Sequence, residues 1–209
     1  MTPWLIFGGG GTGTGLCVIE QALAAGRPLV ALVRNPQAAQ RLAARGVQII
    51  EGDACNVQAV ERACVTAGSK ATLISTLGGA QDYLAHRTLI DVAADRGLKR
   101  MIMVTSLGCG DSWRWLSPRA RAAFGQAVRE KTLAEAWLQT SPLDYAILRP
   151  GGLLNGAATG TARLYQQQEV HGFVNRRDVA QIISQLDEAQ KLNNQIYSLV
   201  DPDLTPETA

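Results

Sequence analysis

The sequence has few of the residues that metal sites and disulfide scaffolds need. It contains two histidines, His86 and His171, which lie far apart and lack a clustered carboxylate partner. The four cysteines form no C-x-x-C pair and show no zinc-type spacing; they are Cys17, Cys55, Cys64 and Cys109. We therefore expect no metal site, and we expect reduced, mostly buried thiols.

The chain also lacks a strong net charge and any long apolar run. Its 209 residues carry 20 Lys and Arg against 18 Asp and Glu, a formal charge of +2. Such a balance gives no long-range attraction to nucleic acid or to anionic lipid. No apolar stretch approaches the roughly 20 residues of a membrane helix, and the first residues do not read as a signal peptide. We expect a cytoplasmic protein with neither kind of partner.

Short aliphatic runs alternate with longer segments of helical period along the whole chain. The expected strands are 4–7, 29–33, 47–50, 72–76, 101–105 and 145–148, with a further one at 196–200. The expected helices are 16–26, 36–46, one after Asn56, 81–96 and 118–139. This rhythm predicts one α/β domain over 1–209, a three-layered, doubly wound parallel sheet of Rossmann type. Right-handed crossovers give the strand order 3-2-1-4-5-6.

A run of glycines, "FGGGGTGTGL" at 7–16, lies between the first strand and the first helix. Two spacings can be read in it: Gly8, Gly10 and Gly13 match G-x-G-x-x-G, and Gly9, Gly13 and Gly15 match G-x-x-x-G-x-G. Glycine is needed where backbone closely approaches a pyrophosphate, which the first amides of the helix then bind. The expected cofactor-binding residues of this run are Gly9, Gly10, Thr12, Gly13, Thr14 and Gly15.

The ends of the next strands indicate which dinucleotide is bound. Arg34 follows the second strand where an NAD-specific fold carries an acid, so Arg34 and Thr12 are expected to bind a 2′-phosphate, which favours NADP(H). Asp53 follows the third strand, where its carboxylate can accept from the adenine amino group and can equally cap the next helix; the two roles do not exclude each other. At the end of the fourth strand, Thr76, Leu77 and Gly78 are expected beneath the nicotinamide half.

By these motifs, together with "RMIMVTSLG", "LDYAILRPGGL" and "NRRDVAQII", the chain resembles the atypical short-chain dehydrogenase/reductases. It is most similar to the biliverdin-IXβ reductase/flavin reductase type and its NmrA-like relatives. The resemblance implies NADP(H) binding, and it places Ser106, Arg149 and Pro150 near the nicotinamide. Asp178 and Val179 correspond to a helix start with a role in stability.

The chain departs from catalytic members of the larger superfamily at one motif. Those enzymes carry Tyr-x-x-x-Lys, in which the tyrosine is the general acid. Lys131 stands at a plausible lysine position for cofactor binding, but Ala127 stands where the tyrosine belongs. Sugar epimerases and alcohol dehydrogenases need that phenol, so both activities become improbable. Flavins, quinones and linear tetrapyrroles accept hydride into a conjugated system and need no such acid.

The loop after the fifth strand, "LGCGDSWRWLSPRAR", supplies the candidate acceptor site. Trp113 and Trp115 are expected to stack on a flat ring, and Arg114 is expected to bind phosphate or propionate. Alternatively, the tryptophans cover the core and the arginines are solvated. Ser106 is the candidate catalytic residue that orients the acceptor, or it satisfies a backbone group at the strand end.

We therefore expect an NADPH-dependent reductase whose acceptor is a flavin, such as FMN, or a linear tetrapyrrole such as biliverdin. Two alternatives stay open: a non-catalytic NmrA-like redox sensor or assembly factor, and a quinone reductase. The stretch 150–180 is rich in Gly and Thr and is expected to be an irregular lid or substrate loop. We expect a monomer.

Overall fold

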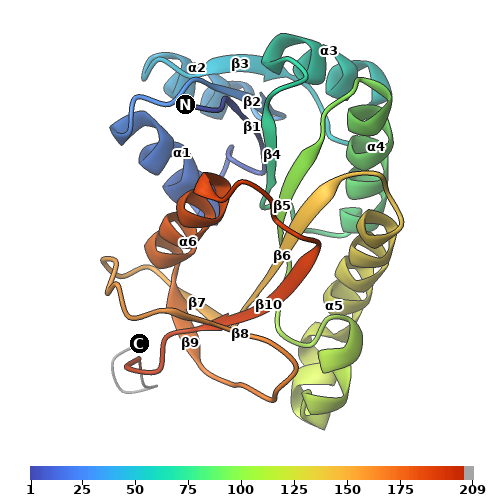
Figure 1. Ribbon diagram of the computed structural model, residues 1–209, viewed down its shortest axis with the longest axis vertical. Helices are drawn as coiled ribbons and strands as arrows, with labels where there is room; N and C mark the ends of the chain where they lie inside the picture. Colours follow the sequence, from blue (N-terminus) through green and yellow to red (C-terminus); the bar gives the residue numbers. More distant parts are fainter. Residues whose placement is uncertain (205–209) are drawn as a thin grey trace.

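The computed structural model describes residues 1–204 and has the alternating architecture that the periodicity predicts (Figure 1). Its strands are β1 (Trp4–Phe7), β2 (Leu29–Val33), β3 (Gln48–Glu51), β4 (Thr72–Ser75), β5 (Arg100–Val104), β6 (Asp144–Pro150), β7 (Gly152–Leu154), β8 (Arg163–Tyr165), β9 (Phe173–Asn175) and β10 (Gln195–Val200). Its helices are α1 (Thr14–Ala24), α2 (Pro36–Ala43), α3 (Val57–Ala67), α4 (Asp82–Asp95), the 3-10 helix η1 (Gly110–Trp115), α5 (Pro118–Gln139) and α6 (Arg176–Glu188).

Eight of the strands within residues 1–204 form one sheet in the order β3-β2-β1-β4-β5-β6-β10-β8. All neighbours are parallel except β8, which runs antiparallel to β10. The first six strands confirm the expected order 3-2-1-4-5-6. Because the winding reverses between β1 and β4, their carboxyl ends form the edge at which such folds bind ligands.

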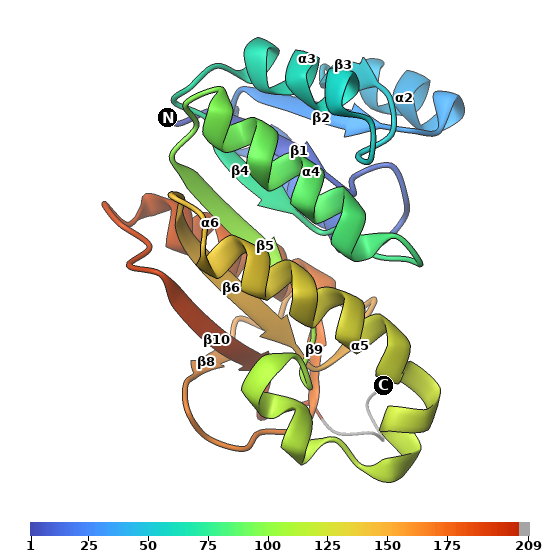
Figure 2. The ribbon, with the colours of Figure 1, turned by 90° about the vertical axis from the view of Figure 1, so that its right-hand side faces the viewer.

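Helices cover both faces of the sheet, so the molecule has three layers (Figures 1 and 2). Successive residues of β1 show how this arises: Trp4 and Ile6 pack with α1, α2 and α6, whereas Leu5 and Phe7 pack with α3, α4 and α5. All four side chains are fully buried. A strand buried on both faces has a continuous apolar sequence, as this one does.

The segment 151–175 differs from the expected irregular loop. It contains β7 and β9, which pair in parallel as a second small sheet, and β8, which extends the main sheet. These strands are three residues long and pair with partners far away in the sequence, so local periodicity gives little sign of them. The expected strand at 196–200 is confirmed as β10.

The cysteines remain free thiols in the fold. Cys64 and Cys109 are buried, and burial raises the pKa of each to about 12, whereas Cys17 and Cys55 are half-buried. Among residues 1–204, no three His, Cys, Asp or Glu side chains lie close enough together to hold a metal ion. None of the helices in this part of the chain is long and apolar enough to cross a membrane.

A buried carboxylate joins three elements at the amino-terminal edge of the sheet. Asp187, whose side chain is 2% exposed, accepts hydrogen bonds from Trp4 Nε1 at 2.8 Å, Arg27 Nη1 at 2.7 Å and Thr72 Oγ1 at 2.7 Å. Arg27 also stacks on the indole of Trp4, with Cζ 4.3 Å from the ring centroid. This cluster joins the end of α6 to β1 and β4. It lies at the amino-terminal edge of the sheet, opposite the edge formed by the carboxyl ends of β1 and β4.

Replacing this carboxylate should destabilise the fold strongly. Asp187→Asn leaves the Arg27 guanidinium buried without its counter-ion, so we expect the free energy of unfolding to fall by about 3 kcal/mol. Urea denaturation measures the change. Asp91→Asn is a matched control, because Asp91 also accepts an indole N–H, from Trp137 at 2.7 Å, but is 51% exposed. A loss below about 1 kcal/mol for Asp187→Asn contradicts this account.

Candidate functional site

A cavity of about 760 Å³ lies at the carboxyl edge of the sheet, where the winding reverses. Its volume is in the range of small-molecule and cofactor sites. Four segments line it, and each follows one of the strands β1 to β4. These are the glycine run at Gly8, Gly10 and Gly11; Val33, Arg34 and Asn35; Gly52, Asp53, Ala54 and Cys55; and the stretch from Thr76 to Asp82.

Missing side chains shape the floor of this cavity. Gly8 has φ +93°, and a Cβ there would lie 2.6 Å from Thr76 Oγ1. A Cβ on Gly15 would meet the Gly8 carbonyl oxygen. The backbone after β1 therefore lies directly against the backbone after β4, which requires glycine. Gly13 is the N-cap of α1 and supplies no side-chain cap, so the first amides of α1 remain free to bind an anion. A glycine cradle with free amides fits a dinucleotide pyrophosphate.

Arg34 and Asp53 lie together at one end of the cavity. Arg34 is 79% exposed, and its Nη1 lies 3.2 Å from Asp53 Oδ2. The Cys55 backbone N–H donates to Asp53 at 2.8 Å; this bond, followed by the Arg34 guanidinium, lowers the pKa of Asp53. Asn56, rather than Asp53, caps α3 by accepting from the Ala59 amide at 2.9 Å. Asp53 is therefore left in the cavity wall and is not the helix cap.

Lys131 of α5 binds the segment after β4 that lines the cavity. Its Nζ donates to the Leu77 carbonyl at 2.8 Å and to Asp82 Oδ2 at 2.7 Å. The Lys131 side chain is 15% exposed and the Asp82 side chain only 1% exposed. A Cβ on Gly78 would lie 3.9 Å from Nζ, so the cation borders the segment that lines the cavity. This places the predicted Lys131, Leu77 and Gly78 together.

Behind this ion pair lies a buried histidine. His86 Nδ1 lies 2.9 Å from the Asp82 carbonyl and 2.8 Å from Asp82 Oδ1, and Nε2 lies 2.8 Å from Ser75 Oγ. With its proton on Nδ1, the ring donates to Asp82 and accepts from the Ser75 hydroxyl. Burial alone would raise the pKa of Asp82, but the hydrogen bond from His86 and the charge of Lys131 lower it. Asp82 therefore stays an anion that holds the Lys131 ammonium in place.

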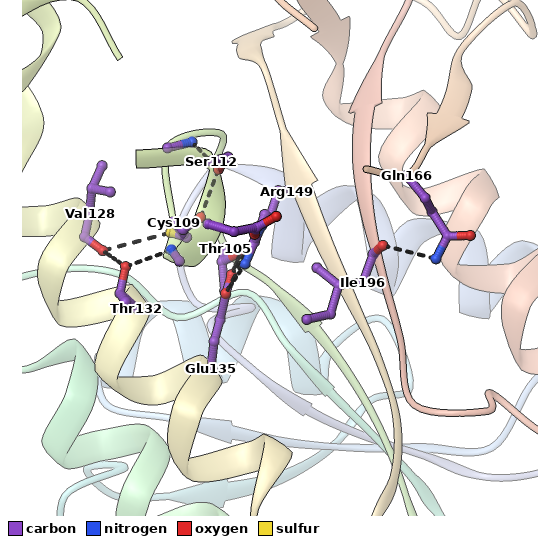
Figure 3. Close-up of polar contacts among 12 residues, drawn as sticks. Thr105, Cys109, Ser112, Val128, Thr132, Glu135, Arg149, Gln166 and Ile196 are labelled. Carbon is purple, nitrogen blue, oxygen red and sulfur yellow. Dashed lines mark hydrogen bonds and ion pairs between the residues drawn. The ribbon is translucent and has the colours of Figure 1, made fainter. Parts of the chain in front are cut away.

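Arg149 does not line the cavity that the glycine run forms. Its side chain is 5% exposed, and its guanidinium binds Glu135 through Nε at 3.0 Å and Nη2 at 2.6 Å (Figure 3). Nη1 also binds Asp111 at 2.5 Å. Thr105 donates to the same Glu135 carboxylate at 2.6 Å. Burial alone would raise the pKa of Asp111, but Arg149 lowers it. Two carboxylate partners, Glu135 and Asp111, thus fix β6 to α5 and η1, so the Arg149 side chain supports the loop after β5. Its expected place near the nicotinamide stays a prediction.

Pro150 and Ser106 belong to the same supporting region. Pro150 is buried at the end of β6, and its carbonyl accepts from the Leu107 amide at 2.9 Å. Ser106 is half-buried just after β5, and its hydroxyl donates to the Leu107 carbonyl at 3.0 Å. Neither residue lines the cavity at the glycine run. The structure thus favours the backbone-satisfying alternative for Ser106, and its role toward an acceptor stays a proposal.

The two tryptophans of η1 are covered by arginines. Arg114 stacks on Trp115 at 4.7 Å, and Arg121 and Arg129 stack on Trp113 at 5.3 and 5.5 Å. Trp113 packs over Gly125 of α5, where a Cβ would lie 3.3 Å from its ring, and it borders a second groove of about 690 Å³. Trp115 and Arg114 do not line this groove. The predicted acceptor residues are therefore not brought together around one cavity.

The sequence gives no sign of the roles of Asp82 and His86 at the site, or of Glu135 in the supporting network. Asp82 and His86 are four residues apart in a helix, a spacing that puts two polar side chains on one face. In the sequence, His86 is considered only as a metal ligand, and this pair is not predicted. Glu135 has the same relation to Lys131 on α5. Of the two threonines predicted in the glycine run, Thr12 is exposed before α1 and Thr14 is buried in the first turn of α1. The ionic partners Lys131 of Asp82 and Arg149 of Glu135 come from other elements, so spacing within one helix does not reveal these pairs.

Residues 9–189 match the NAD(P)H-binding family. A solved structure entitled ChuY, an anaerobillin reductase from Escherichia coli O157:H7, is 64% identical with a TM-score of 0.96, over 98% of this chain and 100% of that one. The uncharacterized sugar epimerase YhfK of Bacillus subtilis is 32% identical over 83% of this chain and 82% of its own length. Sanguinarine reductase of Eschscholzia californica is 30% identical over 56% of this chain and 44% of its own length.

The ion pair beneath the cavity makes a testable contribution to stability. Asp82→Asn leaves the Lys131 ammonium without its carboxylate, and we expect a loss of about 2 kcal/mol in the free energy of unfolding at pH 7. Because the pKa of Asp82 is lowered in the folded protein, its stabilisation is present above about pH 4 and is lost as pH falls through the folded value. The gap between wild type and variant should therefore narrow in acid.

Urea denaturation of both proteins at pH 7 and near pH 3 measures this gap. Asp95→Asn is the control, because Asp95 lies on the same helix but is exposed. It should change stability by no more than about 0.5 kcal/mol at either pH. If the difference in unfolding free energy between wild type and Asp82→Asn stays constant or widens in acid, Asp82 is not an anion paired with Lys131.

Proposed function

This chain belongs to the NAD(P)H-binding family and is an oxidoreductase, and we propose that it transfers hydride from NADPH to a linear tetrapyrrole. The proposal combines the cavity at the carboxyl edge, which suits a dinucleotide, with an acceptor that needs no protein acid. The observation that carries the choice of acceptor is the 64% identity, along almost the full length, to a protein entitled an anaerobillin reductase. Anaerobilin is a tetrapyrrole.

The chemistry of the chain supports such an acceptor. No Tyr-x-x-x-Lys occurs in the sequence, and Ala127 is exposed on α5 where the phenol of a classical family member would stand. A substrate whose reduction requires a phenolic proton donor, such as a ketone or a sugar, is therefore a poor fit. A conjugated tetrapyrrole spreads the added charge and can take its proton from water.

Different residues in and beside the cavity bind different parts of the cofactor. NADPH, when bound, supplies the hydride. The amides at the start of α1 and the glycine run bind the pyrophosphate, Arg34 binds the 2′-phosphate, and Asp53 accepts from the adenine. Lys131, held by Asp82, binds the nicotinamide ribose and orients that half of the cofactor, while Thr76, Leu77 and Gly78 leave room beneath it. Positioning of this kind is the main requirement for hydride transfer.

The choice of acceptor is tested by anaerobic NADPH oxidation with biliverdin, FMN and a short-chain quinone offered in turn. We expect turnover with biliverdin to exceed that with the other two at equal concentration. Gly10→Val is a control for contaminating reductases, because Gly10 lines the cavity and already lies close to Val33, so a side chain there should block cofactor entry. Oxidation with FMN or the quinone alone, or none with any acceptor, contradicts the proposal.

The preference for NADPH is tested at Arg34. Arg34→Glu replaces a donor for the 2′-phosphate by a repelling charge, so we expect NADPH affinity to fall at least about tenfold while NADH affinity stays within about twofold. Fluorescence titration of each cofactor measures both. Arg41→Glu, an exposed change on α2 away from the cavity, carries the same charge difference and serves as the control. An unchanged NADPH to NADH ratio removes Arg34 from the account.

A further inference from the structure

A further cation, Arg176, lies beside the glycine run on the face of the sheet that α1 and α6 share. Arg176 is the first residue of α6, which packs beside α1 (Figure 1). Its Nε lies 3.8 Å from the position that a Cβ of Gly13 would occupy. Gly13 is also the N-cap of α1. The half-buried guanidinium therefore lies next to the free amides of that helix.

The contacts of Arg176 leave its charge uncompensated. Nη1 donates to the Leu153 carbonyl at 3.1 Å and to Asn155 Oδ1 at 2.8 Å, both neutral acceptors. Among the described residues, Arg176 has no carboxylate within ion-pair distance, and neither Nε nor Nη2 has a hydrogen-bond acceptor. The neighbouring Arg177, in contrast, lies 3.6 Å from Glu20 Oε2.

Two positive features thus meet at one point without an anion. The amino end of α1 carries a partial positive charge, and its first turn holds no acidic residue. A guanidinium held beside it is unfavourable unless an anion lies between them. Asn155 and the Leu153 carbonyl fix the guanidinium there, which is the arrangement of a preorganised donor rather than of a solvated surface arginine.

We propose that Arg176 is a direct ligand of the cofactor pyrophosphate, opposite the amides of α1. This rests on the proposed function only in taking a dinucleotide as the ligand; it depends neither on the tetrapyrrole nor on the 2′-phosphate. Because the same guanidinium binds Leu153 and Asn155, pyrophosphate binding also fixes the start of the segment after β6. Arg34 then distinguishes NADP(H) from NAD(H), whereas Arg176 serves both.

The test is a set of binding titrations without any acceptor. NADPH and NADH are titrated directly by fluorescence, and adenosine 2′-monophosphate, which has no pyrophosphate, is measured by displacement of NADPH. Arg176→Gln should weaken NADPH and NADH by the same factor, about tenfold or more, and leave adenosine 2′-monophosphate within about twofold of wild type. Arg177→Gln removes the same charge one residue away and should leave all three within about twofold.

Equal losses of dinucleotide affinity in Arg176→Gln and Arg177→Gln overturn the proposal, since they indicate a long-range effect of the positive charge. An equal loss of affinity for adenosine 2′-monophosphate also overturns it, since it indicates a distorted cavity. So does an Arg176→Gln variant that binds both dinucleotides as wild type does. Thermal melts check folding. If Arg176→Gln is unfolded, Arg176→Lys replaces it, and its loss must again spare adenosine 2′-monophosphate. Failure of the NADPH preference appears separately, as equal NADPH and NADH affinities in wild type.

Discussion

The close approach of two backbone turns, after β1 and after β4, is the constraint on which the site depends. Gly8 and Gly15 lie where a side chain would collide with Thr76 or with the loop itself. This contact lets the loop turn sharply into α1, so that the first amides of the helix point toward the cavity. It also holds the segment Thr76 to Gly78 close against the glycine run, so that this segment lines the cavity without filling it. The cavity is therefore a consequence of missing side chains more than of any one that is present.

Charge is arranged around this cradle by three cations from three elements. Arg34 follows β2 and is exposed, Lys131 comes from α5 and is held by a buried Asp82, and Arg176 begins α6 without a carboxylate partner. Two buried ion pairs lie away from the cavity, between Arg27 and Asp187 at the amino edge and between Glu135 and Arg149 beside the loop after β5. Stability and binding are thus largely separated in space.

The sequence predicts those parts of the molecule that short-range patterns specify. The positions of β1 to β6, the five main helices and the strand order follow from aliphatic runs, Gly and Pro punctuation and crossover handedness, and the structure confirms them. The glycine run and Arg34 are also found from local spacing, and the structure places both at one cavity. The short strands of 151–175 were missed because their partners are distant along the chain.

The sequence also does not reveal which side chains from different elements pair with one another. The family resemblance places Arg149 near the nicotinamide, but no local pattern indicates the buried network in which Glu135 and Asp111 hold it. Asp82 and Arg176 went unnoticed, since their significance comes from Lys131 on α5 and from Gly13 before α1. Tertiary packing decides such pairs, and propensity and period carry no information about them.

The central claim is that this cavity holds NADPH for direct hydride transfer to the acceptor. Single-turnover reaction of biliverdin with NADPH deuterated at one or the other face of the nicotinamide C4, followed by mass spectrometry of the product, tests it most directly. The account predicts one deuterium per product molecule from one of the two labelled cofactors and none from the other. A reduced product without deuterium from either cofactor would contradict it.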